Sequence, residues 1–348
     1  MDVRDILIEE NSTMIQAMEV LDRTSKKVLF VESEGKLAAA ITDGDIRRWI
    51  LAKGSLDAKV KDIANYKPKF LYEKDKHKAK EYMKKNTIEA LPIVDKNKRI
   101  ISVTMLNKED IESKTNLNIP VVIMAGGFGT RLYPYTKILP KPLIPIGELP
   151  IAEHIINSFY RYGCNDFYLI VNHKKNMIKA YFNEAKRDYR ITYIDEDVPL
   201  GTGGGLSLLK NQIKSAFILS NCDILIREDY GKVYQFHKKE NNFITMIASL
   251  KNIRIPYGVI EIHENGEISG MKEKPELSFF ANTGCYVVEP GVIEEMEGGM
   301  PSDFPDIIEK HRSSGKKVGV YPISENSWMD MGQPDEMEEM RKRLCGDD

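Results

Sequence analysis

A short apolar run that stops at a cluster of glycines constrains this chain more than any other feature. Val121 to Met124 are apolar, and Gly126, Gly127 and Gly129 follow at once. Such a run is typical of a strand buried on both faces of a parallel sheet. Glycine lets the backbone turn sharply and approach a ligand, because no Cβ is in the way. Arg131 then offers a guanidinium suited to phosphate oxygens, so we predict a nucleotide phosphate site.

The spacing of the glycines excludes two common phosphate loops. No Lys stands where a Walker loop requires it, and Leu132 follows where a dinucleotide fingerprint requires glycine. A plain tight turn is the alternative that spacing alone leaves open. However, Gly-Gly-x-Gly-Thr-Arg-Leu followed by Leu-Pro-Lys-Pro-Leu at 139–143 resembles the signature of the sugar-1-phosphate nucleotidyltransferases, or NDP-sugar pyrophosphorylases.

That resemblance implies roles for residues along this first glycine-rich turn. Arg131 would hold the β- and γ-phosphates and the leaving pyrophosphate, and Lys141 would stabilise charge near the α-phosphate. Two prolines fix the backbone around Lys141, although a solvated surface lysine is the alternative for that residue alone. The remaining expected nucleotide contacts are Met124, Ala125, Gly126, Gly127, Gly129 and Thr130.

A second glycine-rich turn, at 199–206, precedes a predicted helix. Its amides are suited to a purine base edge and a ribose, and a simple turn is the alternative. The turn resembles the base-recognition loop of the nucleotidyltransferases. Its Leu-Gly-Thr-Gly-Gly sequence is most similar to that of guanylyltransferases that make GDP-mannose or GDP-heptose. The expected contacts are Gly201, Thr202, Gly203 and Gly204.

Two aspartates are the predicted metal ligands. Asp223 follows an apolar strand that starts at Phe217, and Mg²⁺ takes few protein carboxylates beside waters and substrate phosphates. The resemblance implies that Asp223 is the main Mg²⁺ ligand and that Asp330, in a Trp-x-Asp-x-Gly segment, is the second. Cys222 stands where the family has glycine, and we expect it to be a small buried residue. Helix capping is the alternative for Asp223.

A sugar-phosphate pocket is expected from two later segments. The resemblance implies that Lys274 pairs with the sugar phosphate, that Glu273 and Asn282 bind sugar hydroxyls, and that Gly258 places a backbone amide against the sugar. For Glu273 and Lys274 alone, a solvated surface ion pair is the alternative.

The first 115 residues contain an internal repeat. The segment 30–41 and the segment 93–104 both read as strand, charged turn, strand, and each follows a helix-like stretch. This duplication resembles a CBS domain pair, with copies at about 1–55 and 56–115, a polar linker at 109–118 and a nucleotidyltransferase domain at 119–348. The expected fold class is therefore a doubly wound, Rossmann-like α/β domain preceded by an α+β CBS pair.

The resemblance implies one intact adenosine-type site, at Thr42 and Asp45. Met105 and Lys108 replace them in the second copy. We favour the alternative in which Asp43 and Asp45 only cap a helix from Ile46. An adenine nucleotide is thus an optional ligand of the pair, and because CBS pairs often dimerise, a homodimer is expected.

Composition excludes several classes of protein. The net charge of -2 gives no electrostatic case for nucleic acid. No apolar run approaches the roughly 20 residues that span a bilayer, and the N-terminus lacks the layout of a signal peptide. Four scattered cysteines fit reduced thiols, so we expect a cytoplasmic protein.

Together these features predict an enzyme that joins an NTP, GTP by preference, to a sugar 1-phosphate and releases pyrophosphate. An amino sugar such as glucosamine 1-phosphate, used for bacterial surface glycans, is the favoured acceptor by resemblance. One alternative is a cytidylyl- or uridylyltransferase acting on phosphocholine or a similar acceptor. Another is a non-catalytic adenylate-sensing scaffold, although such a scaffold needs no pair of metal ligands.

Overall fold

The computed structural model describes residues 3–24, 26–52, 54–86, 88–106, 115–184 and 186–346. The chain divides into two compact units, Met1–Glu112 and Ser113–Asp348. Residues 107–114, which include Lys108 and positions 109–114 of the predicted linker, lie outside the described residues.

The first unit repeats one small sheet design. Strand β1 pairs in parallel with β2, which pairs antiparallel with β3, and β4, β5 and β6 repeat this order and these directions. The hairpins lie where the internal repeat predicts them, while the CBS assignment stays a prediction. With η for 3₁₀ helices, the elements are η1 (Val3–Ile6), β1 (Leu7–Ile8), α1 (Met14–Thr24), β2 (Val28–Ser33), β3 (Lys36–Thr42), α2 (Asp43–Leu51), η2 (Val60–Asp62), β4 (Leu71–Tyr72), η3 (Glu73–Lys78), α3 (Ala79–Asn86), β5 (Ala90–Val94) and β6 (Ile100–Met105).

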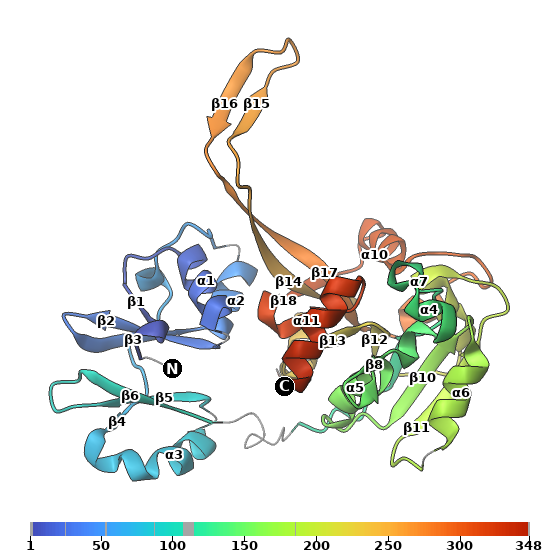
Figure 1. Ribbon diagram of the computed structural model, residues 1–348, viewed down its shortest axis with the longest axis horizontal. Coiled ribbons are helices and arrows are strands. Elements are labelled where there is room, and N and C mark those ends of the chain that lie inside the picture. Colours follow the sequence, from blue (N-terminus) through green and yellow to red (C-terminus); the bar gives the residue numbers. More distant parts are fainter. Residues whose placement is uncertain are drawn as a thin grey trace. The chain divides into compact units, whose positions relative to one another are not determined.

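The second unit is built on a seven-stranded sheet with the order β11-β10-β7-β12-β17-β14-β18 (Figure 1). Strands β11, β10, β7 and β12 are parallel, whereas β17 runs antiparallel to β12 and β14. The sheet strands are β7 (Val121–Met124), β10 (Asp166–Val171), β11 (Arg190–Asp195), β12 (Phe217–Asn221), β14 (Ile244–Arg254), β17 (Glu276–Val288) and β18 (Val318–Ser324). The parallel half of the sheet agrees with the predicted doubly wound α/β fold, whereas the antiparallel pairing of β17 makes the whole sheet mixed.

Helices and short strands complete this unit. The helices are η5 (Thr130–Leu132), α4 (Tyr135–Ile138), η6 (Lys141–Leu143), α5 (Ile151–Tyr160), α6 (Lys175–Glu184), α7 (Gly201–Gly204), η7 (Gly205–Leu209), α8 (Tyr230–Glu240), α9 (Gly291–Glu294), α10 (Phe304–Ser313), η8 (Glu325–Ser327) and α11 (Pro334–Cys345). The short strands are β8 (Pro145–Ile146), β9 (Leu149–Pro150), β13 (Ile224–Ile226), β15 (Val259–Ile262), β16 (Ile268–Lys272) and β19 (Trp328–Asp330).

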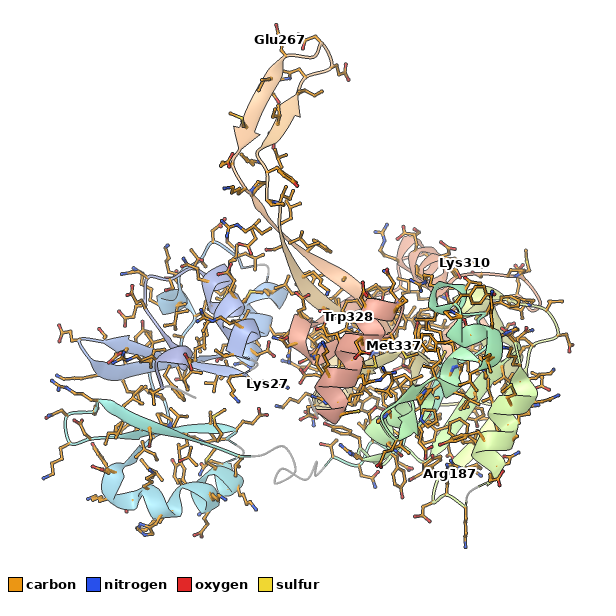
Figure 2. The ribbon with its side chains drawn as sticks, in the orientation of Figure 1. Lys27, Arg187, Glu267, Lys310, Trp328 and Met337 are labelled. Carbon is orange, nitrogen blue, oxygen red and sulfur yellow. The ribbon has the colours of Figure 1, made fainter. Side chains whose placement is uncertain are left out.

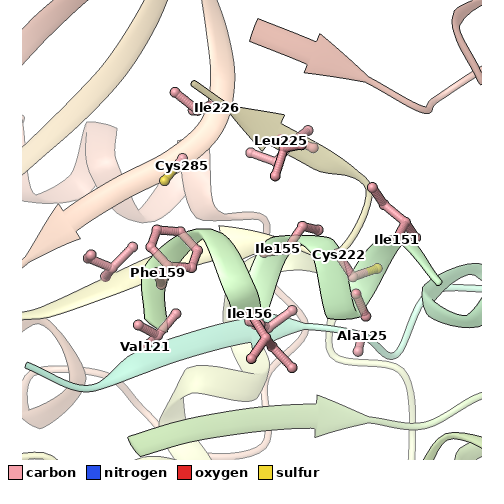
Figure 3. Packing of buried hydrophobic residues seen from close by; sticks show 14 of the residues in the cluster. Val121, Ala125, Ile151, Ile155, Ile156, Phe159, Cys222, Leu225, Ile226 and Cys285 are labelled. Atoms are coloured by element: carbon pink, nitrogen blue, oxygen red, sulfur yellow. The ribbon is translucent and has the colours of Figure 1, made fainter. Parts of the chain in front are cut away.

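Strand β7 is buried on both faces, as its apolar run predicts. Val121 and Ile123 pack into one hydrophobic cluster and Val122 into another, because alternate residues of a strand point to opposite faces. The first cluster includes side chains of α5, α6, α8 and α11, and the second includes side chains of α9 and α10. Figure 3 shows Val121 against Ile156 and Phe159 of α5. Helices on both faces hold β7 rigidly, so the loop after it starts from a fixed point.

A two-stranded ribbon, β15 and β16, continues from β14 and β17 and projects away from the sheet (Figure 1). Figure 2 labels Glu267 at its far end. The cross-strand pairs Ile260–Met271 and Ile262–Ile268 are exposed, and Lys272 forms an ion pair with Glu261. The ribbon therefore carries both apolar and charged side chains at its surface.

Candidate active site

The parallel strands β7, β10, β11 and β12 end at one edge of the sheet, and loops from that edge form the site. In open α/β sheets ligands bind at this carboxyl edge. The first glycine-rich turn leaves β7 here, and the backbone N–H of Ala125 donates to the Ile170 carbonyl of β10 at 2.8 Å. The turn is thus joined to the neighbouring strand before its glycines begin.

Within this turn the glycines have different tasks. Gly129 adopts a left-handed backbone with φ of 65°, and a Cβ there would lie 2.9 Å from Thr136 Cγ2 and 3.2 Å from Lys141 Cβ. The Thr136 hydroxyl donates to the Gly129 carbonyl at 2.8 Å. A Cβ on Gly127 would meet no atom of the described chain within 4 Å. Gly129 therefore shapes the turn, and Gly127 presents open backbone.

Lys141 and Asp223, two of the predicted site residues, meet beside the turn. The Lys141 ammonium donates to Asp223 Oδ2, and the two side chains are 9% and 13% exposed. Lys141 begins η6, between two prolines, and Asp223 lies between β12 and β13. Lys141 thus brings a buried positive charge to the end of β12, beside the glycine-rich turn that follows β7.

Asp330 and Arg131 join the same group. Asp330 ends β19, directly opposite Ile224 of β13, and the backbone N–H of Met331 donates to the Asp223 carbonyl at 2.8 Å. A Cβ built on Gly332 would lie 3.2 Å from Asp330 Oδ1 and 3.4 Å from Arg131 Nη1, so both side chains flank Gly332. Two segments far apart in the chain therefore place a second carboxylate and a guanidinium here.

The Asp330 carboxyl is electrostatically strained. Burial, followed by the negative charges of Asp223 and Glu336, raises the pKa of Asp330 to about 6. Its Oδ1 atom is buried and accepts no hydrogen bond from the residues that the structure describes. A divalent cation would relieve both conditions, because it supplies positive charge and a bond to that oxygen.

These two carboxylates fit Mg²⁺ held largely by substrate and water. Across residues 3–346, leaving out the undescribed positions, no cluster of three or more His, Cys, Asp or Glu side chains could hold a metal by itself. Mg²⁺ in nucleotide sites commonly takes one or two carboxylates together with phosphate oxygens. Asp223 and Asp330 are therefore the residues that would hold it.

Cys222 is an inert neighbour of this group. It is 6% exposed, and Figure 3 shows it near Ala125 and Ile151 in the core. Burial, with a smaller effect of the Asp223 charge, raises the pKa of the Cys222 thiol to about 12. The sulfur therefore remains a thiol at neutral pH and acts as a small apolar group.

The second glycine-rich turn departs from the sequence interpretation. Two of the amides expected to meet a base, those of Gly203 and Gly204, both donate to the Ser302 carbonyl at 2.9 Å. The Thr202 amide and hydroxyl use Asp303 Oδ1, at 3.1 and 3.0 Å. Of the four predicted contacts in this turn, Gly201 and Thr202 are exposed, and Gly203 and Gly204 are buried. The amides of Thr202, Gly203 and Gly204 are thus committed to the loop before α10 and are not free to bind a base.

The predicted sugar residues are not all brought to this edge. Asn282 lies close, because a Cβ on Gly284 would lie 2.5 Å from Asn221 Nδ2, and Asn282 Oδ1 accepts from the Gly284 amide. Its Nδ2 donates to the Tyr286 hydroxyl at 2.7 Å.

Gly258, Glu273 and Lys274 lie elsewhere, at the base of the ribbon. Strand β17 continues beyond Asn282 to Glu276, a separation of about 20 Å at the rise of an extended strand. Glu273 and Lys274 are exposed, and their charged groups are 3.9 Å apart. The structure therefore corrects the expectation of one assembled pocket: long β14–β17 pairing carries these residues away, and their sugar contacts stay predictions.

The Thr42 corner of the first unit is a helix cap. Thr42 is the N-cap of α2: Asp45 N donates to Thr42 Oγ1 at 3.1 Å, and Thr42 N donates back to Asp45 Oδ2 at 2.8 Å. Arg48 pairs with the other carboxylate oxygen of Asp45. The helix begins at Asp43, so the expected start at Ile46 is wrong, and ligand binding by Thr42 and Asp45 remains a prediction.

Sequence reasoning missed one carboxylate at the sheet edge, Glu196. It follows β11, and its backbone N–H donates to the Val171 carbonyl at 2.9 Å. The side chain is 5% exposed and lies between the two glycine-rich turns: a Cβ on Gly126 would be 2.7 Å from its Oε2, and one on Gly205 would overlap its Oε1. An acidic residue directly after a strand of the parallel half of the sheet was the available signal.

Comparison with known proteins agrees with this architecture. The family model described as Nucleotidyl transferase matches residues 120–346, nearly the whole second unit. The chain belongs to the nucleotidyl transferase family. The mannose-1-phosphate guanyltransferase of Yarrowia lipolytica is 33% identical over 228 residues, which cover 61% of this chain and 60% of that protein. The bifunctional protein GlmU of Methanococcus maripaludis is 32% identical over 224 residues, covering 61% and 51%. The chain thus spans only part of these relatives.

Solved structures of other proteins share the fold of the second unit. HddC from Yersinia pseudotuberculosis superposes with a TM-score of 0.52 at 22% identity, covering 65% of this chain and 99% of that chain. A protein of Bacillus anthracis named "putative glucose-1-phosphate thymidylyltransferase" gives a TM-score of 0.53 at 21% identity, covering 66% of this chain and 96% of that chain. Among the helices in the described part of the chain, none is long and apolar enough to cross a membrane.

Proposed function

We propose that the protein transfers a nucleotidyl group from an NTP to a sugar 1-phosphate and releases pyrophosphate. The observation that supports this most is the meeting of Arg131, Lys141, Asp223 and Asp330 beside the open backbone of Gly127. Two cationic side chains and two carboxylates beside a glycine turn suit a polyphosphate and a divalent cation. The names of the similar guanyltransferases favour GTP as the donor and mannose 1-phosphate or another sugar 1-phosphate as the acceptor.

In this reaction a sugar phosphate oxygen attacks the α-phosphorus, and the bond from that phosphorus to the bridging oxygen of pyrophosphate breaks. The protein needs no general base, because the attacking phosphate is already an anion. Its work is alignment and charge neutralisation. Mg²⁺, held by Asp223 and Asp330, supplies positive charge to the phosphates when bound.

The charged side chains of this chain have separate tasks in that proposal. Lys141, fixed by its ion pair with Asp223, neutralises charge near the α-phosphate. Arg131 is exposed and faces Gly332, so its guanidinium is available to the β- and γ-phosphates and then to pyrophosphate. Asn282, beside Asn221, is the sugar contact that the geometry favours.

The first unit has a separate proposed role as a CBS pair that dimerises the protein or regulates it. Its support is the repeated three-stranded sheet. Sedimentation of the intact protein and its rate of pyrophosphate release, each measured with and without AMP or ATP, test this. A dimer, or a rate that changes with AMP or ATP, supports the role. A monomer whose sedimentation and rate do not respond to either nucleotide contradicts it.

The transferase proposal is tested by pyrophosphate release with Mg²⁺ across GTP, UTP, CTP, ATP and dTTP and a panel of sugar 1-phosphates, with phosphocholine included. One productive pair with a sugar 1-phosphate establishes the reaction and names base and sugar together. Turnover with phosphocholine alone would show that the acceptor is phosphocholine and not a sugar 1-phosphate. Binding of an NTP without turnover on any acceptor would favour the non-catalytic scaffold.

A further inference from the structure

Lys174 joins the loop after β10 to the segment that follows the first glycine-rich turn. Its ammonium donates to the backbone carbonyls of Thr136 at 2.9 Å and Lys137 at 2.6 Å, both in the single-turn helix α4. The last carbonyls of a helix have no partner within the helix, and a cation near them is favourable. The residue four positions after Thr136 is Pro140, which has no N–H to donate to that carbonyl. Lys174 thus supplies a donor that the α4 segment lacks.

Helix α4 needs such support, because one turn of helix has little stability by itself. Its position also bears on the site. Thr136 is 1% exposed, and its hydroxyl donates to the Gly129 carbonyl at 2.8 Å. Three residues after α4 ends, the chain reaches Lys141, which pairs with Asp223. A shift of α4 would therefore move both the glycine-rich turn and the lysine that is proposed to face the α-phosphate.

The loop that carries Lys174 contacts the first glycine-rich turn at its start as well. The backbone N–H of His173 donates to the Gly126 carbonyl at 3.4 Å, and the ring centroids of His173 and Phe128 are 5.0 Å apart. Lys174 itself has a left-handed backbone with φ of 52°, which is unfavourable for a residue with a Cβ. Such a conformation persists where the surrounding contacts hold it. His173 and Lys174 therefore contact both ends of one segment, 126–137.

We propose that Lys174 is a positioning residue for nucleotidyl transfer, which fixes α4 and thereby holds the glycine-rich turn and Lys141 in place for the NTP phosphates. This inference rests on the proposed function. An ammonium has three donors, and Lys174 uses two of them on backbone carbonyls. Lys174 therefore orders the segment before the NTP arrives, which distinguishes it from a residue that only binds a phosphate.

Hydrogen exchange of the full-length protein without NTP tests this ordering directly. Lys174→Met keeps an apolar stem and removes the donors, so amides at 130–139 should exchange about tenfold faster than in the wild type, because local opening frees them. Lys174→Arg, whose guanidinium can donate to both carbonyls, should restore most of the protection. Lys175→Met is the matched control, because Lys175 pairs with Asp195. The control should exchange at 130–139 like the wild type.

Pyrophosphate release with the most productive NTP and sugar 1-phosphate of the panel relates this order to the reaction. Lys174→Met should raise KM for the NTP about tenfold and lower kcat about tenfold, because the turn and Lys141 must be ordered in each turnover. KM for the sugar 1-phosphate should stay within about twofold of the wild-type value, since the favoured sugar contact, Asn282, lies on β17. Lys174→Arg should recover most of the loss.

The outcomes separate the inference from the proposed function. Unchanged exchange at 130–139 in Lys174→Met overturns the inference while nucleotidyl transfer stands. Faster exchange with wild-type KM and kcat per folded molecule also overturns it, because Lys174 would then be merely structural. A wild type that releases no pyrophosphate with any pair of the panel overturns the proposed function and the positioning role together.

Discussion

The two glycine-rich turns of the second unit use their glycines in opposite ways. Gly127 of the first turn leaves its backbone open, since a Cβ there would meet nothing in the described structure within 4 Å. Gly203 of the second turn is packed: a Cβ would lie 2.6 Å from Ile307 Cδ1, and its amide donates to Ser302. Glycine thus leaves open backbone in one turn and allows packing against helix α10 in the other, and glycine content alone does not distinguish them.

The strongest test of this contrast is the carboxylate that faces the open turn. Asp223→Asn should lower kcat about 1000-fold, because it removes the charge that is proposed to hold Mg²⁺ and orders Lys141. Pyrophosphate release measures the effect, and circular dichroism shows that the protein is still folded. Asp229→Asn, at the N-cap of α8 where Asn caps equally well, is the control. Wild-type-like activity in Asp223→Asn would contradict the assignment of Asp223 as a Mg²⁺ ligand.

Glu196, which touches both turns, should oppose folding when it is ionised. Its pKa is about 7 in the folded protein against 4.5 as the reference, so the folded state binds the proton more tightly. The free energy of unfolding should therefore fall between pH 4.5 and pH 7 and level off above. Glu196→Gln removes this loss and should be more stable than wild type by up to about 3 kcal/mol at pH 8.

Urea denaturation of both proteins at pH 5 and pH 8 measures that difference. The stabilisation should be small at pH 5, where the carboxyl is largely protonated, and full at pH 8. Equal differences at both pH values would contradict the titration of Glu196 as its cause.

Substitution of a glycine in the packed second turn should lower the stability of the protein. Gly203→Ala places a methyl group against Ile307 and the backbone of Phe304, so unfolding should become easier by about 2 kcal/mol. Thermal denaturation reports this loss, while kcat per folded molecule should stay near the wild-type value. A raised KM for the NTP without any loss of stability would instead make this turn a ligand site.

Substitution of a glycine in the open first turn should weaken binding of the NTP. Gly127→Ala meets no protein atom of the described chain, so the melting temperature should hardly change. The added methyl group should obstruct phosphate approach and raise KM for the NTP about tenfold, or about 1.4 kcal/mol. Gly298→Ala, another open glycine, should change neither quantity. An unchanged KM in Gly127→Ala would show that the ligand does not approach this backbone.

Local patterns predicted much of the second unit but not its long-range pairing. The apolar runs of β7 and β12 revealed buried strands, and the residues after them, Gly126 and Asp223, lie together at the sheet edge. Glu273 and Lys274 were misplaced because the length of β14–β17 pairing depends on contacts between distant segments. Glu196 was missed because it stands between Asp195 and Asp197, where a run of acids reads as solvated surface.

The long pairing of β14 with β17 has a consequence for hydrogen exchange. The paired residues run from Ile244–Val288, inside the core, through a register shift between Ile247 and Ala248, to Arg254–Glu276, at the base of the ribbon. Amides at the core end are freed only when the whole unit unfolds, whereas those near the ribbon are freed by local opening. Protection should therefore fall continuously along the same two strands, so that one pair of strands records both the global stability of the unit and the independent opening of its ribbon.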